Sequence, residues 1–271
     1  MTAAFPAPAW LVGCGNMAGA MVEGWRAGGL DLSGVTVIRP SGKPVGGIRT
    51  VTDYPAGENP RFVMLGFKPQ KLGEVAPGLE PHVGETTTLV SMLAGVTAES
   101  LRERFPRAQA IVRIMPNLPV AQVFGVTGIY SADVDDETEL ARLPFSSLGI
   151  VVFCETEEEL GVVGAVAAAG VAYVARFAEA LAKSAEALGI RPILARMMAD
   201  QTLTGTGAYA AATSASMSEI ARRVASPGGT TEQGLAVLDA PEGLQHLVDR
   251  TLAAAIRRGH ELAAEAAARR D

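Results

Sequence analysis

A change in sequence pattern near residues 154–159 is the feature that most constrains the fold. Before it, short apolar runs alternate with amphipathic helical patterns; after it, the pattern is one helix after another. Alternating strands and helices favour a mainly parallel sheet, because parallel strands need crossover connections. The sequence therefore predicts an α/β fold: a doubly wound sheet over residues 1–155, then an all-α domain over residues 156–271.

The expected elements follow from apolar periodicity and from turn residues. The expected strands are Ala9–Val12, Val35–Arg39, Arg61–Phe67, Thr87–Met92, Ala110–Ile114, Gly125–Ser131 and Ile150–Phe153. The expected helices are Met17–Ala27, Ala98–Phe105, Glu157–Leu188 with a break near Gly170, Pro192–Ala212, Met217–Val224, Thr231–Leu238 and Glu242–Arg270.

Composition excludes several classes of protein. Of the 271 residues 48% are hydrophobic and 19% charged, which is typical of a well-packed chain. The net charge of −6 and the lack of a basic tract argue against a nucleic-acid partner. Cys14 and Cys154 lie too far apart for a metal motif, so we expect no metal, a reducing compartment and, since residues 1–8 do not resemble a secretory leader, the cytoplasm. The apolar run 161–175 is short and Gly-rich, and we expect a buried helix rather than a membrane span.

A glycine motif follows the first expected strand. Residues 13–18, Gly-Cys-Gly-Asn-Met-Ala, match G-x-G-x-x-G/A at a strand–turn–helix junction. Gly13 permits the tight turn, Gly15 lets the main chain approach a pyrophosphate, and Ala18 keeps the helix close to the strand. This context predicts a Rossmann-type dinucleotide site that includes Cys14, Asn16 and Met17, against the alternative of a packing turn.

The end of the second strand indicates which dinucleotide binds. An NAD site needs an acid there for the ribose 2′-hydroxyl, whereas this chain has Arg39, Ser41 and Lys43; Asp31 precedes the strand, at the wrong end. These groups favour NADP(H), with NAD(H) possible, unless the cations are merely solvated.

Three further strand ends carry polar or small residues. They are Gly66-Phe67-Lys68-Pro69-Gln70, Ser91-Met92-Leu93-Ala94-Gly95 and Arg113-Ile114-Met115-Pro116-Asn117. Ligands of open α/β sheets bind at the carboxyl ends of the strands. We expect Lys68 to reach a ribose or phosphate, Ala94 and Gly95 to pass near a nicotinamide, and Asn117 to fix an amide or a polar group of the substrate.

The loop Ser226-Pro227-Gly228-Gly229-Thr230-Thr231 has two interpretations. It is either an ordinary helix start, with Thr230 as N-cap and Glu232 in the first turn, or a receptor in which glycine N–H groups and a helix N-terminus bind a carboxylate.

In their order, Gly13–Ala18, Lys68-Pro69-Gln70, Arg113-Ile114-Met115-Pro116-Asn117 and Ser226–Thr231 resemble the pyrroline-5-carboxylate reductase family over nearly the whole chain. The resemblance implies NADPH-dependent reduction of a cyclic imine to L-proline, the last step of proline biosynthesis. It also implies an all-helical dimerisation domain, a homodimer or assembly of dimers, and Thr231 at the ring nitrogen. Ser226, Gly228, Gly229, Thr230 and Asn117 would line the substrate.

One segment departs from the family, and rival functions stay open. Where the family usually has Ser-Gly-x-Gly-Pro-Ala-Tyr, this chain has Ala167-Ala168-Ala169-Gly170-Val171-Ala172-Tyr173. The alternatives are another imine reductase, a β-hydroxy-acid dehydrogenase using Lys183, or a non-catalytic NADP(H) sensor. None of His82, His246 and His260 falls in a motif, which disfavours His-dependent hydroxy-acid chemistry.

Overall fold

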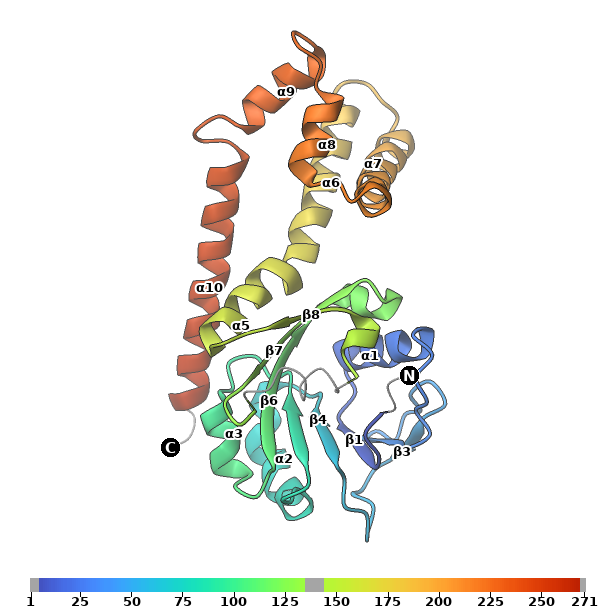
Figure 1. Ribbon diagram of the computed structural model, residues 1–271, viewed down its shortest axis with the longest axis vertical. Coiled ribbons are helices and arrows are strands. Elements are labelled where there is room, and N and C mark those ends of the chain that lie inside the picture. The colour runs from blue at the N-terminus through green and yellow to red at the C-terminus, as the bar shows by residue number, and fades with distance from the viewer. Residues whose placement is uncertain (1–4, 135–143, 269–271) are drawn as a thin grey trace. The chain divides into compact units, whose positions relative to one another are not determined.

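The computed structural model describes residues 5–134 and 144–268 (Figure 1). Residues 1–4, part of the segment considered as a leader, and Arg269–Arg270, the expected end of the last helix, lie outside this range. The chain forms two compact units, Met1–Ala169 with Ala255–Asp271, and Gly170–Ala254. This division rests on contacts alone, so the functional ranges 1–155 and 156–271 stay a prediction.

The first unit contains an eight-stranded sheet in the order β3-β2-β1-β4-β5-β6-β7-β8. Its strands are β1 (Ala9–Val12), β2 (Val35–Ile38), β3 (Arg49–Val51), β4 (Phe62–Leu65), β5 (Thr88–Ser91), β6 (Ala110–Pro116), β7 (Gly125–Ser131) and β8 (Gly149–Phe153). Every pairing is parallel except β6 with β7. The predicted α/β class and mainly parallel sheet are confirmed, and the strand order reverses between β1 and β4, where such sheets bind ligands.

Side chains of β1 point alternately into two apolar cores, one on each face of the sheet. Leu11 lies in a core with Met21 and Trp25 of α1 (Asn16–Ala27). Trp10 lies in the other core, beneath α2 (Leu72–Leu79) and α3 (Ala98–Arg104). Because both faces are buried, β1 and β4 are apolar throughout rather than alternating, and β2 is buried throughout with Thr36 as its one polar residue.

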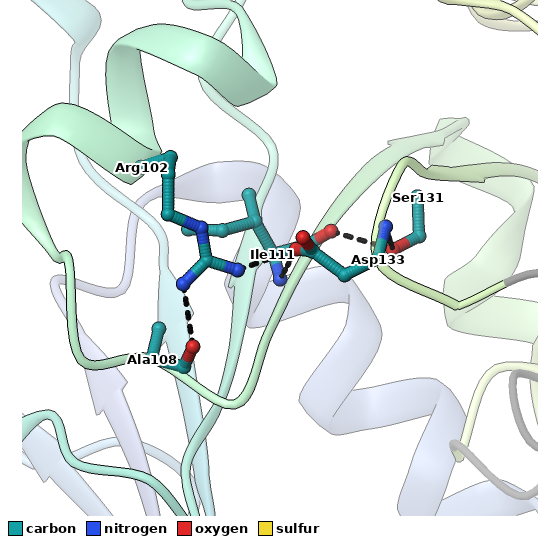
Figure 2. A network of polar contacts seen from close by, with 5 residues as sticks. All are labelled: Arg102, Ala108, Ile111, Ser131 and Asp133. Atoms are coloured by element: carbon teal, nitrogen blue, oxygen red, sulfur yellow. Dashed lines mark hydrogen bonds and ion pairs between the residues drawn. The ribbon is translucent and has the colours of Figure 1, made fainter.

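A polar network holds the amino end of β6 (Figure 2). Asp133 Oδ2 accepts from the Ile111 N–H (2.7 Å) and pairs with Arg102 of α3 (2.6 Å), and Ser131 Oγ donates to the Ile111 carbonyl (2.8 Å). Arg102 also donates to the Ala108 carbonyl. The network ties α3, β6 and β7 together at the edge of the sheet opposite the motif-bearing strand ends.

A helix with an irregular turn leads out of the first unit. It comprises α5 (Glu157–Val163), the π-helical turn η5 (Gly164–Ala168) and, in the second unit, α6 (Gly170–Ala187). In η5 the Ala169 N–H bonds the Gly164 carbonyl five residues back (2.9 Å). The irregularity therefore lies at 164–168, a few residues before the predicted break at Gly170.

The second unit is entirely helical. Besides α6 it contains α7 (Pro192–Thr213), α8 (Met217–Val224), α9 (Thr230–Leu238) and the first part of α10 (Leu244–Ala268), whose remainder belongs to the first unit. Helices α6 and α7 pack together through small residues, with Ala178, Ala182, Ala195 and Ala199 buried.

Large apolar side chains are exposed on these helices, among them Phe177, Leu181, Ile193 and Met197. By length and composition alone, one helical stretch among the described residues, Glu157–Ala187, is long and apolar enough to cross a membrane. The expectation that residues 161–175 form a buried helix is wrong within the single chain, where only Ala165 of that run is buried. Within one subunit α5 and η5 pack against β6 and β7, and most of the surface of this run is left uncovered.

Candidate active site

The expected first-unit site residues meet at one edge of the sheet. They follow the carboxyl ends of β2, β1, β4, β5 and β6, which are consecutive neighbours in the strand order. Parallel alignment places these ends together, so residues far apart in sequence share one edge. Ser226–Thr231 belong to the second unit.

The glycine turn after β1 is shaped by close main-chain contacts. Gly13 has φ +76°, and a Cβ there would lie 2.9 Å from the Gly66 carbonyl oxygen. A Cβ on Gly66 would in turn lie 3.1 Å from Ala18. The predicted roles of Gly13 and Ala18 thus have a physical basis. The sequence placed Gly66 at one of the strand ends but gave it no role of its own, although a glycine directly after the apolar run of β4 was the available signal.

The start of α1 presents main-chain donors at this edge. Gly15 is its N-cap, no side chain caps it, and its first turn holds no acid. The N–H groups of Asn16, Met17 and Ala18 therefore have no intrahelical acceptor. Unsatisfied N–H groups and the positive end of the helix dipole suit a phosphate.

Arg39 adds positive charge beside this turn. Burial raises the pKa of the Cys14 thiol, and the Arg39 guanidinium partly opposes that rise. Arg39 also lies within the turn after β2, where its carbonyl accepts from the Gly42 N–H (3.0 Å). Ser41 and Lys43 of the same turn are exposed, and the Lys43 N–H donates to Ser41 Oγ (3.4 Å).

Asp31 lies at the other end of β2, as expected. Its carboxylate accepts from the N–H (2.9 Å) and Oγ (3.0 Å) of Ser33, and these bonds lower its pKa. It is therefore engaged in a local turn, far along the strand from the glycine motif.

The segments that follow β4 and β5 differ in how exposed their side chains are. Lys68 is exposed, while Phe67 and Pro69 are half-buried. Leu93 is 2% exposed and packs in the core, whereas Ala94 is exposed. Gly95 has φ +75°, and its Cβ would lie 3.0 Å from the Leu262 main chain in α10. Close packing with α10 therefore already requires a glycine at position 95.

At the end of β6, Met115 is half-buried and Asn117 is buried. Asn117 Oδ1 accepts from the Val126 N–H (2.8 Å), and its Nδ2 donates to the Ala167 carbonyl (3.2 Å). These partners fix the orientation of the amide, because a flipped amide would set like groups against each other.

The Ser226–Thr231 loop starts α9 in a way that the sequence did not predict. Gly229, not Thr230, is the N-cap, so the expectation of Thr230 as N-cap is wrong. The Gly228 N–H donates to Glu232 Oε2 (2.8 Å) and the Gly229 N–H to the Ser226 carbonyl (2.9 Å). The N–H groups of Gly228 and Gly229 are therefore used in hydrogen bonds within the loop rather than left open for a ligand.

The glycines of this loop are nevertheless required. Gly228 has φ +70°, and a Cβ on Gly229 would collide with Ser226. The N–H groups of Thr230, Thr231 and Glu232, in the first turn of α9, have no intrahelical acceptor. They form the part of the loop that can receive a carboxylate.

The lysine and two of the histidines considered for rival functions have partners of their own. Lys183 pairs with Glu179 (2.9 Å) and its side chain is 66% exposed, as for a solvated helix pair. His82 packs against Trp10 and Tyr54, and His246 lies 3.3 Å from Glu242. Within residues 5–134 and 144–268, no cluster of His, Cys, Asp and Glu has the arrangement of a metal site.

The chain is similar to known proteins over most of its length. Residues 157–262 match the family model described as pyrroline-5-carboxylate reductase dimerisation. The chain is 30% identical over 261 residues to a pyrroline-5-carboxylate reductase of Pseudomonas aeruginosa, covering 93% of this chain and 95% of that protein.

Two solved structures share the fold. A pyrroline-5-carboxylate reductase of Coxiella burnetii superposes with a TM-score of 0.85 at 32% identity, over 95% of this chain and 98% of that one. A Plasmodium falciparum pyrroline carboxylate reductase with NADP bound gives 0.79 at 21% identity, over 95% and 98%. From these matches, together with the glycine turn and the α9 loop, the chain belongs to the pyrroline-5-carboxylate reductase family.

Proposed function

We propose that this chain reduces 1-pyrroline-5-carboxylate to L-proline with NADPH. The observation that carries the proposal is the uncapped glycine turn at the point where the strand order reverses, in a chain of this family. The Pseudomonas aeruginosa relative, which carries the name of this activity, aligns with the chain over 95% of its own length.

The residues of the first unit fit a dinucleotide. The main chains of Gly13 and Gly66 approach each other too closely for a side chain, and the α1 N–H groups beside them suit a pyrophosphate. Arg39, with Ser41 and Lys43, supports a preference for NADP(H) over NAD(H), because these groups suit a 2′-phosphate. Lys68, the segment Leu93–Gly95 and Met115 complete the proposed cofactor side.

A reduced nicotinamide, when bound, supplies a hydride to the imine carbon. The C=N electrons then become the nitrogen lone pair, and the additional proton comes from water. The protein must align the reactants and exclude competing water, which needs no strong acid. The absence of a histidine from the described strand ends is consistent with this demand.

On the substrate side, the first turn of α9 is the proposed carboxylate receptor. Its open N–H groups are those of Thr230, Thr231 and Glu232, while Ser226, Gly228 and Gly229 shape the loop. The Thr231 hydroxyl is the proposed partner of the ring nitrogen. It orients the nitrogen and relays a proton from water rather than acting as a strong acid.

The second unit is proposed to form a homodimer or an assembly of dimers. The dimerisation match covers residues 157–262, which include the exposed apolar faces of α6 and α7. A second subunit would cover Phe177, Leu181 and Met197, and their exposure then needs no membrane. Since Cys14 and Cys154 are both free thiols, the cytoplasm is the proposed compartment.

The substitution Thr231→Ala tests the proposed role of the hydroxyl. We expect turnover of pyrroline-5-carboxylate to fall by about ten- to a hundred-fold, since a hydrogen bond to a changing charge is worth about 1–3 kcal/mol. The affinity for NADPH should stay nearly unchanged. Steady-state NADPH oxidation and a fluorescence titration measure the two quantities.

Thr231→Ser is the matched control, because it keeps the hydroxyl and should keep most of the turnover. An alanine variant that loses melting temperature but keeps its turnover would mean that Thr231 only serves the helix start. A wild-type protein that binds NADPH without oxidising it in the presence of the imine would instead support the non-catalytic sensor.

A further inference from the structure

Asn117 connects three segments of the first unit through one buried amide. Only 5% of the residue is exposed. Its oxygen accepts from the Val126 N–H at the start of β7, and its nitrogen donates to the Ala167 carbonyl in η5. Both ends of the amide are thus bonded to the main chain, and the side chain has little surface left for a ligand.

The turn that Asn117 holds is itself irregular. In η5 the hydrogen bond from Ala169 skips to Gly164, which widens the helix locally. A widened turn leaves carbonyl groups with displaced partners, and single π-turns often mark functional positions. The Asn117 amide donates to one carbonyl of this turn, that of Ala167, from outside the helix.

A second contact fixes the same turn. A Cβ on Gly164 would lie 3.3 Å from the Met115 side chain, two residues before Asn117. A Cβ on Gly128 of β7 would lie 2.9 Å from Val163, the residue preceding η5. The ends of β6 and β7 therefore fix η5 by packing as well as by the Asn117 hydrogen bond.

The turn η5 lies where the chain passes from the first unit to the second. The first unit ends at Ala169 and the second begins at Gly170, two and three residues after the carbonyl that Asn117 binds. The turn η5 is thus the last turn of segment Met1–Ala169 before the chain continues into the second unit.

We propose that Asn117 is a positioning residue, which acts through Ala167 and not by touching a ligand. This inference rests on the proposed function, in which Met115, at the end of β6, borders the cofactor. It replaces the expectation, drawn from the motif alone, that the Asn117 side chain contacts substrate or cofactor. Misplacing reacting groups by about 1 Å lowers the rate by about a hundred-fold, so loss of the tie should appear in kcat.

The test uses Asn117→Asp in the full-length protein. The aspartate keeps an acceptor for the Val126 N–H but sets an oxygen against the Ala167 carbonyl. We expect amide hydrogen exchange at residues 164–169 to become at least about ten-fold faster, because a local tie is lost. We also expect kcat to fall by about ten-fold or more, with the Kd for NADPH within about three-fold of wild type.

Asn117→Ala is the second variant, since it removes both bonds without adding a charge, and it should change exchange and kcat in the same direction. Asp133→Asn is the matched control. It weakens a side-chain tie to the main chain of the same strand, at Ile111, at the other end of β6 (Figure 2). It should leave exchange at 164–169 and kcat unchanged.

Each outcome decides the proposal. Unchanged exchange at 164–169 would overturn it, and so would unchanged kcat with faster exchange, or an equal loss of kcat in Asp133→Asn. A rise in the Kd for NADPH without faster exchange would assign Asn117 to ligand binding. A wild-type protein without turnover would refute the proposed function, while hydrogen exchange would still show whether Asn117 holds η5.

Discussion

Thr127 carries a buried hydroxyl group that has no hydrogen-bond partner among the described residues. It lies on β7 opposite Pro116 and is 1% exposed, and its Oγ1 is the buried side-chain nitrogen or oxygen atom that lacks a partner among the described residues. A buried hydroxyl without a hydrogen bond costs free energy. We expect Thr127→Val to raise the free energy of unfolding by about 1 kcal/mol, measured by denaturant titration.

Thr87 provides the matched control for this prediction. It is 2% exposed, but its Oγ1 donates to the Pro60 carbonyl (2.7 Å) and accepts from the Gly84 N–H (3.1 Å). Thr87→Val should therefore lower the free energy of unfolding by about 1–3 kcal/mol, because two buried main-chain groups lose their partner. Equal effects of the two substitutions would contradict the account of Thr127.

At the scale of elements, the turn after β2 should determine cofactor choice. We expect Arg39→Ala to weaken NADPH binding by about 1–3 kcal/mol and to leave NADH binding almost unchanged, since only NADPH carries a 2′-phosphate. Titration of both cofactors measures this. Asp31→Asn, at the opposite end of the same strand, should alter neither affinity. If NADPH and NADH lost affinity equally in Arg39→Ala, the 2′-phosphate assignment would fail.

The sequence predicted most elements because the sheet is buried on both faces and its strands are apolar runs. It missed β3, which has three residues and no buried one, and α2, whose interior contains Pro77. The edge that carries the cofactor motifs was predictable, since parallel strands end together. The bonds of Asn117 and Glu232 were not, because each depends on a turn geometry that residue types alone do not specify.

For the whole molecule, association is the property to test. Val174, Phe177 and Leu181 are exposed on α6 at spacings of three and four residues, which places them on one face of the helix. We expect light scattering to show a dimer or larger assembly, and Leu181→Glu to shift it toward monomer and lower turnover. Ile150→Glu, an exposed site in β8 of the first unit, should leave association unchanged. A wild-type monomer at micromolar concentration would contradict the dimer proposal.

The return of α10 to the first unit has a consequence for how the protein is made. Residues from Ala255 onward belong to the same unit as the sheet, and the main chain at Leu262 packs against Gly95. A ribosome releases these residues after those of the second unit, whereas domains generally fold as they emerge. The loop after β5 in the nascent sheet therefore stays uncovered by α10 until the helices of the second unit have been synthesised. The first unit is thus completed only after residues 170–254 have been synthesised.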